Sequence, residues 1–203
     1  MEFSMGLKNL GIFGGSFDPI HNGHIKISLL AQKQLHLDIL LFIPVYDQWM
    51  KNRGPYATSI DRLDMINVSI SNLKNIQTCD IDIKRKKHTY TIDTLSDLIK
   101  LYPKVEKIYL IVGEDSINKM DKWYKSEEIK KICTIAVYKR KNKKILMKSF
   151  KNDFNENIVD IVGPRIDISS TKIRDNIDKN LSIESLVPRQ VEEIIIKREL
   201  YKS

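Results

Sequence analysis

The fold of this chain is decided by residues 10–24, which read Leu-Gly-Ile-Phe-Gly-Gly-Ser-Phe-Asp-Pro-Ile-His-Asn-Gly-His. The first four residues are an apolar run typical of a short strand, and helical spacing begins at the other end. Between them, Gly14 and Gly15 predict a sharp turn whose backbone can approach a ligand closely, because no Cβ obstructs it. The amides that follow, from Ser16 and Phe17 onward, can hold phosphate oxygens together with the positive end of the next helix.

A pair of histidines stands at the start of that helix. His21 and His24 are three residues apart, so on a helical turn they point to the same side. There they can donate hydrogen bonds to an α-phosphate in transfer and to the leaving phosphates. Asp18-Pro19 stiffens the turn, and Gly23 permits a close approach at the helix start. The alternatives are an ordinary loop with helix-capping histidines, or a metal site, although no further His or Cys lies nearby to complete one.

Apolar runs alternate with helix-period segments along the rest of the chain, which predicts β-α-β units on a parallel sheet. The predicted strands are 10–13, 39–43, 76–83, 107–112, 134–138 and 158–162. The predicted helices are 23–35, 61–73, 91–101, 170–177 and 189–201, the third with Leu95, Leu98 and Ile99 facing the core. This order indicates the α/β class: a doubly wound, Rossmann-like parallel sheet in one domain, residues 1–203. In such sheets ligands bind beyond the carboxyl ends of the strands.

A second motif opens the small helical C-terminal part, which we place at residues 165–203. Residues 168–174 read Ile-Ser-Ser-Thr-Lys-Ile-Arg. Ser169, Ser170 and Thr171 crowd a helix start, where hydroxyls cap backbone amides. Arg174 lies one turn inside, where a guanidinium can grip two phosphate oxygens and counter the charge of a departing pyrophosphate. Capping alone explains one of the hydroxyls, so both interpretations stay open.

Three further segments place polar and aromatic side chains next to predicted strands and helices. They are residues 89–95 (Thr-Tyr-Thr-Ile-Asp-Thr-Leu), 112–116 (Val-Gly-Glu-Asp-Ser) and 121–124 (Asp-Lys-Trp-Tyr). The first precedes a helix, and the second follows a buried strand, which puts Asp115 at the carboxyl edge of the sheet. Taken singly, each segment has a structural explanation: a capping Thr, a turn Asp or a half-buried Trp.

Together the segments resemble a known family of enzymes. The first and last motifs resemble the HxGH and SSTxxR signatures of a nucleotidyltransferase superfamily, and the middle segments resemble the YTxxTL, GxDS and Trp pattern of nicotinate/nicotinamide mononucleotide adenylyltransferases. The resemblance runs from about residue 10 to residue 201. It implies that ATP is bound by residues from both ends of the chain: Gly14, Gly15, Ser16, Phe17, His21, His24, Ser169, Ser170, Thr171 and Arg174. Catalysis is assigned to His21, His24 and Arg174.

The resemblance also implies a site for the acceptor mononucleotide, made of Lys51, Tyr90, Thr91, Gly113, Asp115, Trp123 and Tyr124. Trp123 would stack on the flat cationic pyridine ring. Thr91 and backbone amides near Tyr124 would recognise the carboxylate or amide of the ring, and Asp115 would contact nucleotide hydroxyls. Arg62 and Met65 match a further RxxM pattern. For Lys51, Arg62 and Met65 a structural role is equally open.

The implied activity transfers AMP from ATP to nicotinate mononucleotide, or to nicotinamide mononucleotide, forming deamido-NAD or NAD and pyrophosphate. No carboxylate cluster looks like a dedicated metal cage, so we expect Mg²⁺ to travel with ATP. The YTxxTL pattern favours the bacterial-type branch, which acts mainly on the nicotinate form, whereas residues 47–51 and Glu114 depart from that branch. The alternatives are a pantetheine-phosphate adenylyltransferase and a non-catalytic nucleotide sensor on the same fold.

Composition bounds the partners and the compartment. The net charge is +8, but the lysines are scattered and the densest run, residues 139–144, lacks the interleaved aromatics that stack bases, so we expect no nucleic-acid partner. No apolar run approaches the roughly 20 residues that cross a bilayer, so we expect no membrane partner. Cys79 and Cys133 lack close pairing or metal-ligand spacing and fit reduced thiols in the cytoplasm. A homo-oligomer is left open.

Overall fold

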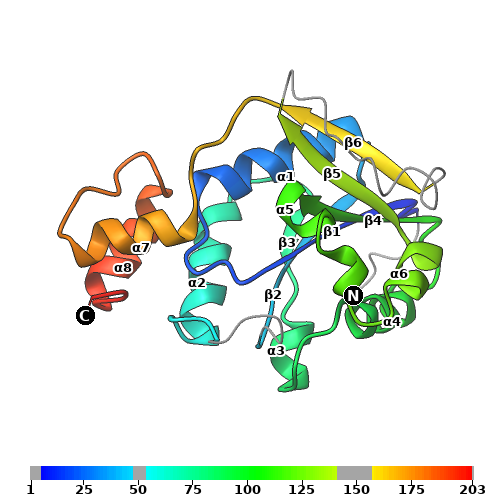
Figure 1. Cartoon of the computed structure of the whole chain (residues 1–203), viewed down its shortest axis with the longest axis horizontal. Helices are drawn as coiled ribbons and strands as arrows, with labels where there is room; N and C mark the ends of the chain where they lie inside the picture. The colour runs from blue at the N-terminus through cyan, green and yellow to red at the C-terminus, as the bar shows by residue number, and fades with distance from the viewer. Residues whose placement is uncertain (1–5, 48–53, 141–156, 203) are drawn as a thin grey trace.

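Six parallel strands form one sheet in the computed structural model, which describes residues 6–47, 54–140 and 157–202 (Figure 1). The strands are β1 (Asn9–Gly15), β2 (Ile39–Pro44), β3 (Ile76–Thr78), β4 (Lys107–Gly113), β5 (Thr134–Arg140) and β6 (Ile158–Gly163). Their order across the sheet is β3-β2-β1-β4-β5-β6. The order reverses between β1 and β4, and in open α/β sheets ligands bind at the carboxyl ends beside such a reversal. The predicted doubly wound fold class is confirmed.

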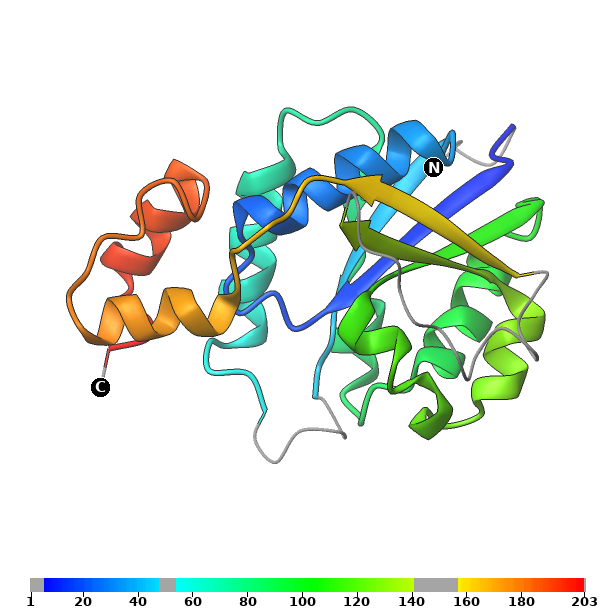
Figure 2. The same cartoon turned by 45° about the horizontal axis from the view of Figure 1, so that its top comes forward.

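Helices cover both faces of the sheet (Figure 1 and Figure 2). One apolar cluster joins a face of the sheet to α1 (Asn22–Gln34), α2 (Ser59–Ile70), α7 (Ser170–Asp178) and α8 (Arg189–Lys197). A second cluster joins the other face to α4 (Thr91–Leu101), α5 (Glu114–Ile117) and α6 (Ser126–Ile132). The remaining short helices are α3 (Ile81–Arg85) and the 3-10 turn η1 (Met120–Lys122). No helix within the described ranges is long and apolar enough to cross a membrane.

Strand β2 shows why the sheet has to be covered on both sides. Every residue of β2 is buried. Leu40 and Phe42 belong to the first cluster, whereas Leu41 and Ile43 belong to the second, because successive side chains of a strand point to opposite faces. A continuous apolar run is typical of a parallel strand packed between two layers of helices.

The predicted strand 76–83 is half wrong. Strand β3 ends at Thr78, and Ile81–Arg85 forms helix α3 instead. The apolar residues of this stretch fit a short strand and a one-turn helix equally well. Charge placement favours the helix, because Asp82 lies in its first turn and Lys84 and Arg85 in its last, where each complements the helix dipole.

The predicted core face of α4 is also wrong at one residue. Leu95 and Leu98 are fully buried, but Ile99 is 42% exposed. Ile92 completes the buried face instead, one turn before Leu95. Helices α5 and α6 are not among the predicted elements, because they are too short to show a helical period.

The C-terminal helices lie against α2, beside the end of the sheet that carries the first motif (Figure 2). Val191 and Ile195 of α8 are buried in the first cluster. Arg198 extends the attachment, since its two terminal nitrogens lie 2.7 Å from the carboxylates of Asp61 and Asp64 on α2. The end of the chain is thereby fixed close to residues near its beginning.

Candidate active site

A cavity of about 920 Å³ opens at the carboxyl edge of the sheet, beside the reversal between β1 and β4. Its lining includes most of the residues that the sequence analysis selects: Gly14, Gly15, His21, His24, Tyr90, Thr91, Gly113, Asp115, Trp123, Tyr124, Ser169 and Ser170. Ser16, Phe17, Thr171 and Arg174 are not part of the lining. Lys51 lies outside the described residues. The two motifs and the middle segments therefore share one cavity.

The two histidines are stacked and cap each other's backbone. Their ring centroids are 3.6 Å apart, with 18° between the ring planes. His21 is the N-cap residue of α1, and its Nδ1 accepts a hydrogen bond from the backbone amide of His24 at 3.3 Å. The Nδ1 atom of His24 accepts the backbone amide of His21 at the same distance. The capping interpretation is thus correct, and it uses only one nitrogen of each ring.

This capping fixes where the imidazole protons are. Burial lowers the pKa of His21 to about 4, and burial, reinforced by the charge of His21, lowers the pKa of His24 well below its ordinary value of 6.5. Both rings are therefore neutral at pH 7. Because Nδ1 of each ring is an acceptor, the single proton of the neutral ring is on Nε2. Each imidazole consequently offers an Nε2–H donor.

Gly23 and Gly14 differ in the space that a side chain would have at each position. A Cβ on Gly23 would lie 2.8 Å from Cγ2 of Ile166 and 2.9 Å from Nδ1 of His21, so a side chain would disturb the imidazole pair. A Cβ on Gly14 would meet nothing within 4 Å, because it would point into open space at the cavity.

The sharp turn itself is not where the sequence analysis places it. Gly14 and Gly15 are the last residues of β1, and the left-handed backbone occurs at Phe17, with φ of 48°. The ring of Phe17 is buried and lies edge-on to His24, with centroids 5.0 Å apart. The ring of Phe17 therefore packs against the imidazole of His24.

Asp18 joins the first motif to the rest of the chain. Its side chain is 3% exposed. Its carboxylate accepts hydrogen bonds from the backbone amides of Tyr56 at 2.6 Å and Ala57 at 3.0 Å. The hydroxyl of Tyr201 donates to the same carboxylate at 2.9 Å. Burial and the charge of Asp18 raise the pKa of Tyr201, which keeps that hydroxyl protonated.

The second motif docks directly on the backbone of the first. The hydroxyl of Ser170 donates to the carbonyl of Pro19 at 2.9 Å, and Nη1 of Arg174 donates to the carbonyl of Asp18 at 2.6 Å. The guanidinium of Arg174 also lies 4.4 Å from the ring centroid of Tyr56, within cation–π range. The N-terminus of α7 is thereby held beside the N-terminus of α1, and residues from both helix starts line one cavity.

Further contacts hold the first motif in place. The side chain of Asn22 donates to the carbonyl of Ser185 at 2.7 Å, and the backbone amide of Asn22 donates to that of Leu186 at 2.9 Å. Arg62 is buried and donates to the carbonyl of Ser16 at 2.9 Å. Met65 is fully buried as well. The RxxM pair therefore supports the loop from inside the protein.

Aromatic side chains form another part of the cavity lining, the aromatic wall, which consists of Tyr90, Trp123 and Tyr124. The rings of Tyr90 and Tyr124 are 4.9 Å apart and tilted by 48°. Trp123 belongs to the same lining and is half-buried against the second apolar cluster. Thr91 begins α4, and Gly113 ends β4 without a side chain to block the wall. A flat ring can be held against such a wall.

The lining contains residues that the sequence analysis does not select. Asp82, Asp167 and Lys119 are part of it, together with Glu114. Asp167 stands just before the second motif, so its place could have been inferred from that motif. Asp82 lies in the stretch predicted as a strand, and the sequence carries no signal for its position. Within the described ranges, no group of three or more His, Cys, Asp or Glu side chains could hold a metal ion.

The fold and the paired-histidine cavity define a nucleotidyltransferase, and residues 12–176 match the cytidylyltransferase-like family. A relative from Caldicellulosiruptor saccharolyticus is 36% identical over 95% of this chain and 98% of its own length. A relative from Staphylococcus epidermidis is 34% identical, with 96% and 97% covered. Both are named "probable nicotinate-nucleotide adenylyltransferase". The chain belongs to the nicotinate-nucleotide adenylyltransferase family.

A solved structure shares the fold. The nicotinic acid mononucleotide adenylyltransferase of Plasmodium falciparum, complexed with NaAD, superimposes with a TM-score of 0.77 over 96% of this chain and 97% of its own. The two sequences are 24% identical, so this likeness concerns the fold alone.

The neutral state of His21 predicts a pH-dependent stability. In the unfolded chain this residue binds a proton near pH 6.5, but in the folded protein only near pH 4. Between these values the unfolded state holds more protons, so the free energy of unfolding falls as the pH falls. The variant His21→Asn keeps an acceptor at the cap. Between pH 7 and pH 4.5 its free energy of unfolding should fall by about 2–3 kcal/mol less than that of the wild type. Urea unfolding at both pH values measures the difference.

The control for this experiment is His36→Asn, because His36 is exposed at the end of α1. That variant should keep the pH dependence of the wild type. An unchanged pH dependence in His21→Asn would show that the folded protein does not hold this imidazole neutral.

Proposed function

We propose that the protein transfers AMP from ATP to nicotinate mononucleotide, forming deamido-NAD and releasing pyrophosphate. One observation carries the proposal: the imidazole pair, the N-terminus of α7 and the aromatic wall line the same cavity. Donors for a triphosphate and a surface for a flat ring are thus close enough to serve one reaction. The names of the full-length relatives support this choice of substrates.

The proposed reaction needs no general base. The 5′-phosphate of the mononucleotide is already nucleophilic at neutral pH, and it attacks the α-phosphorus of ATP while pyrophosphate leaves from the opposite side. Catalysis then consists of orientation and of stabilising the charge that develops on the phosphates. His21 and His24 supply two Nε2–H donors. The Nδ1 hydrogen bonds to backbone amides already fix both rings, so binding phosphate requires little reorganisation of these side chains. Both rings are neutral before the triphosphate binds, so each offers an Nε2–H donor to the phosphate oxygens.

Arg174 is proposed to bind the departing pyrophosphate. Nη1 of its guanidinium donates to the backbone carbonyl of Asp18, and Nη2 lies 3.3 Å from the hydroxyl of Thr171. An arginine has five N–H donors, so donors remain for phosphate oxygens. Since Arg174 is outside the cavity lining, we assign it to the outer, β,γ end of the triphosphate. Ser169 and Ser170, at the start of α7, belong to the same end.

The acceptor is proposed to lie against the aromatic wall. Trp123 would stack on the pyridine ring, because an aromatic face attracts a flat cation. Thr91 and backbone amides near Tyr124 would bind the carboxylate of the ring, and Asp115 would bind nucleotide hydroxyls. Lys51 remains a prediction for this site.

Mg²⁺ is proposed to enter with ATP. It binds oxygen ligands and keeps several waters, so phosphate oxygens with one nearby carboxylate would suffice. Asp115 and Asp167 are carboxylates of the lining that could serve. When bound, the ion would neutralise phosphate charge. We further propose nucleotides rather than nucleic acids as partners, and a cytoplasmic location, which suits the two free thiols Cys79 and Cys133.

The proposal is tested by measuring pyrophosphate release. The purified protein is incubated with ATP, Mg²⁺ and one acceptor: nicotinate mononucleotide, nicotinamide mononucleotide or phosphopantetheine. We expect the highest kcat/KM with nicotinate mononucleotide. Release with phosphopantetheine alone would establish the rival adenylyltransferase, and nucleotide binding without release from any acceptor would establish a sensor.

Replacing His24 should affect turnover rather than folding. His24→Ala removes one fixed Nε2–H donor, so kcat should fall by at least about a hundredfold, the scale of losing one preorganised donor. Steady-state assays measure kcat, and circular dichroism checks the fold. His36→Asn, at an exposed position just after α1, is the control, because asparagine tolerates the left-handed backbone found there. A folded His24→Ala protein with near-normal turnover would remove this residue from the mechanism.

Replacing Trp123 should affect one substrate only. Trp123→Ala removes the ring from the aromatic wall, so binding of nicotinate mononucleotide should weaken by about tenfold, the scale of a cation–π contact in a desolvated site. ATP binding should hardly change. Trp123→Phe, which keeps an aromatic face, should retain much of the affinity. Calorimetric titration with each substrate decides, and a selective loss of ATP affinity would contradict the stacking.

A further inference from the structure

One part of the aromatic wall, Tyr90, lies at the end of a short connection between two helices. Helix α3 ends at Arg85, and α4 begins at Thr91, so residues 86–90 must cross from one helix to the other. Lys86 takes the left-handed conformation, with φ of 53°, at the start of the connection. Tyr90 and Thr91, at its end, line the cavity. Whatever fixes α3 against α4 therefore fixes this part of the wall.

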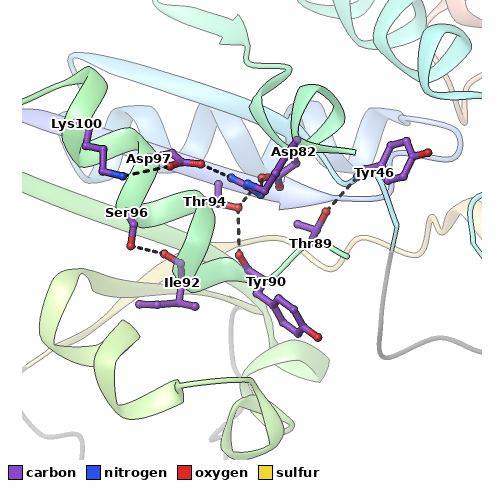
Figure 3. Close-up of polar contacts among 10 residues, drawn as sticks. Tyr46, Asp82, Thr89, Tyr90, Ile92, Thr94, Ser96, Asp97 and Lys100 are labelled. Carbon is purple, nitrogen blue, oxygen red and sulfur yellow. Dashed lines mark hydrogen bonds and ion pairs between the residues drawn. The ribbon is translucent and has the colours of Figure 1, made fainter. Parts of the chain in front are cut away.

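Asp82 is the residue that joins the two helices. Its Oδ1 accepts a hydrogen bond from the hydroxyl of Thr94 at 2.7 Å (Figure 3). The same Oδ1 accepts a hydrogen bond from Nη1 of Arg85, also at 2.7 Å. The other end of the same guanidinium lies 2.7 Å from Oδ2 of Asp97 on α4. Asp82 is 2% exposed, whereas the side chains of Arg85 and Asp97 are 17% and 36% exposed, so the network runs from a buried carboxylate toward the surface. Burial raises the pKa of Asp82, although the bonds from Thr94 and Arg85 oppose the shift.

The network also reaches the backbone of the wall. The hydroxyl of Thr94 lies 3.3 Å from the carbonyl of Tyr90 (Figure 3). On the other side, the backbone amide of Thr89 donates to the carbonyl of Asp47 at 3.2 Å, and its hydroxyl accepts the amide of Tyr46 at 3.2 Å. The connection is held from two directions immediately before Thr91. Asp82 and Thr94 line the same cavity as Tyr90.

We propose that Asp82, acting through Thr94 and Arg85, is a positioning residue that holds the acceptor-binding wall in place, an inference that rests on the proposed function. Its burial beneath the wall makes Asp82 a support for the groups that contact the acceptor. A carboxylate left with fewer partners in such a place is unfavourable, and so is a hydroxyl that loses its acceptor. Removing the charge therefore loosens the wall, whereas the ATP side is held independently by Asp18, Arg62 and the C-terminal helices.

The experiment compares the two substrates in matched variants. Asp82→Asn and Thr94→Val should each raise the KM for nicotinate mononucleotide by about tenfold, as losing an outer-shell partner does, with the KM for ATP within about twofold. Thr94→Ser keeps the hydroxyl and should restore the wild-type KM. Asp80→Asn is the surface control, because Asp80 forms an exposed pair with Lys84 on the same helix, at 3.0 Å.

The outcomes separate the two proposals. If Asp82→Asn does not fold, the network is tested by comparing the KM for nicotinate mononucleotide of Thr94→Val with that of Thr94→Ser, since only the first variant lacks the hydroxyl. Folded variants whose KM for the mononucleotide is unchanged, or in which both KM values rise equally, would overturn the positioning role. A wild-type protein that releases no pyrophosphate with nicotinate mononucleotide would instead overturn the proposed function, and this inference with it.

Discussion

The structure depends on the contacts of Asp18, because this residue joins segments from both ends of the chain. Its carboxylate binds the amides of Tyr56 and Ala57 and the hydroxyl of Tyr201. Its carbonyl accepts Arg174. A buried carboxylate is costly unless several donors surround it, and here the donors come from segments that are distant in sequence. Asp18 therefore brings these segments together through both its carboxylate and its backbone carbonyl.

The capping of α1 has a chemical consequence for the site. A helix N-terminus leaves amides without partners, and serine or aspartate usually caps them. Here two imidazoles do so with Nδ1, which forces the proton onto Nε2. Burial excludes the charged form of both rings. The same contacts that begin the helix thus prepare two neutral donors at the carboxyl edge of the sheet, where a parallel fold places its ligands.

Much of this could be predicted from the sequence. The apolar runs predict the doubly wound α/β class, and the spacing of His21 and His24 predicts that their side chains point to the same side. Both predictions depend only on local periodicity. The sequence predicts the sharp turn at Gly14 and Gly15, but the left-handed backbone is at Phe17. Glycine permits a left-handed backbone without requiring it. The place of Arg174 outside the cavity lining depends on a tertiary bond to Asp18, which no local pattern reveals.

The acceptor side was harder to predict for the same reason. Asp82 stands in the stretch predicted as a strand, and its partners Arg85 and Thr94 meet it only in the folded chain. Hydrophobicity predicts that Ile99 lies in the core, but Ile99 is exposed. Ile92, Leu95 and Leu98 already fill the face of α4 that packs on the sheet. Local patterns locate the elements, whereas long-range contacts select the side chains that complete the site.

The central claim is that the imidazole pair and Arg174 bind one triphosphate. A crystal structure of the protein with a non-hydrolysable ATP analogue tests it most directly. The account predicts that Nε2 of His21 and of His24 contact the α- and β-phosphate oxygens, and that Arg174 contacts the terminal phosphates while it still holds Asp18. A triphosphate bound away from the imidazoles, or out of reach of Arg174, would contradict it.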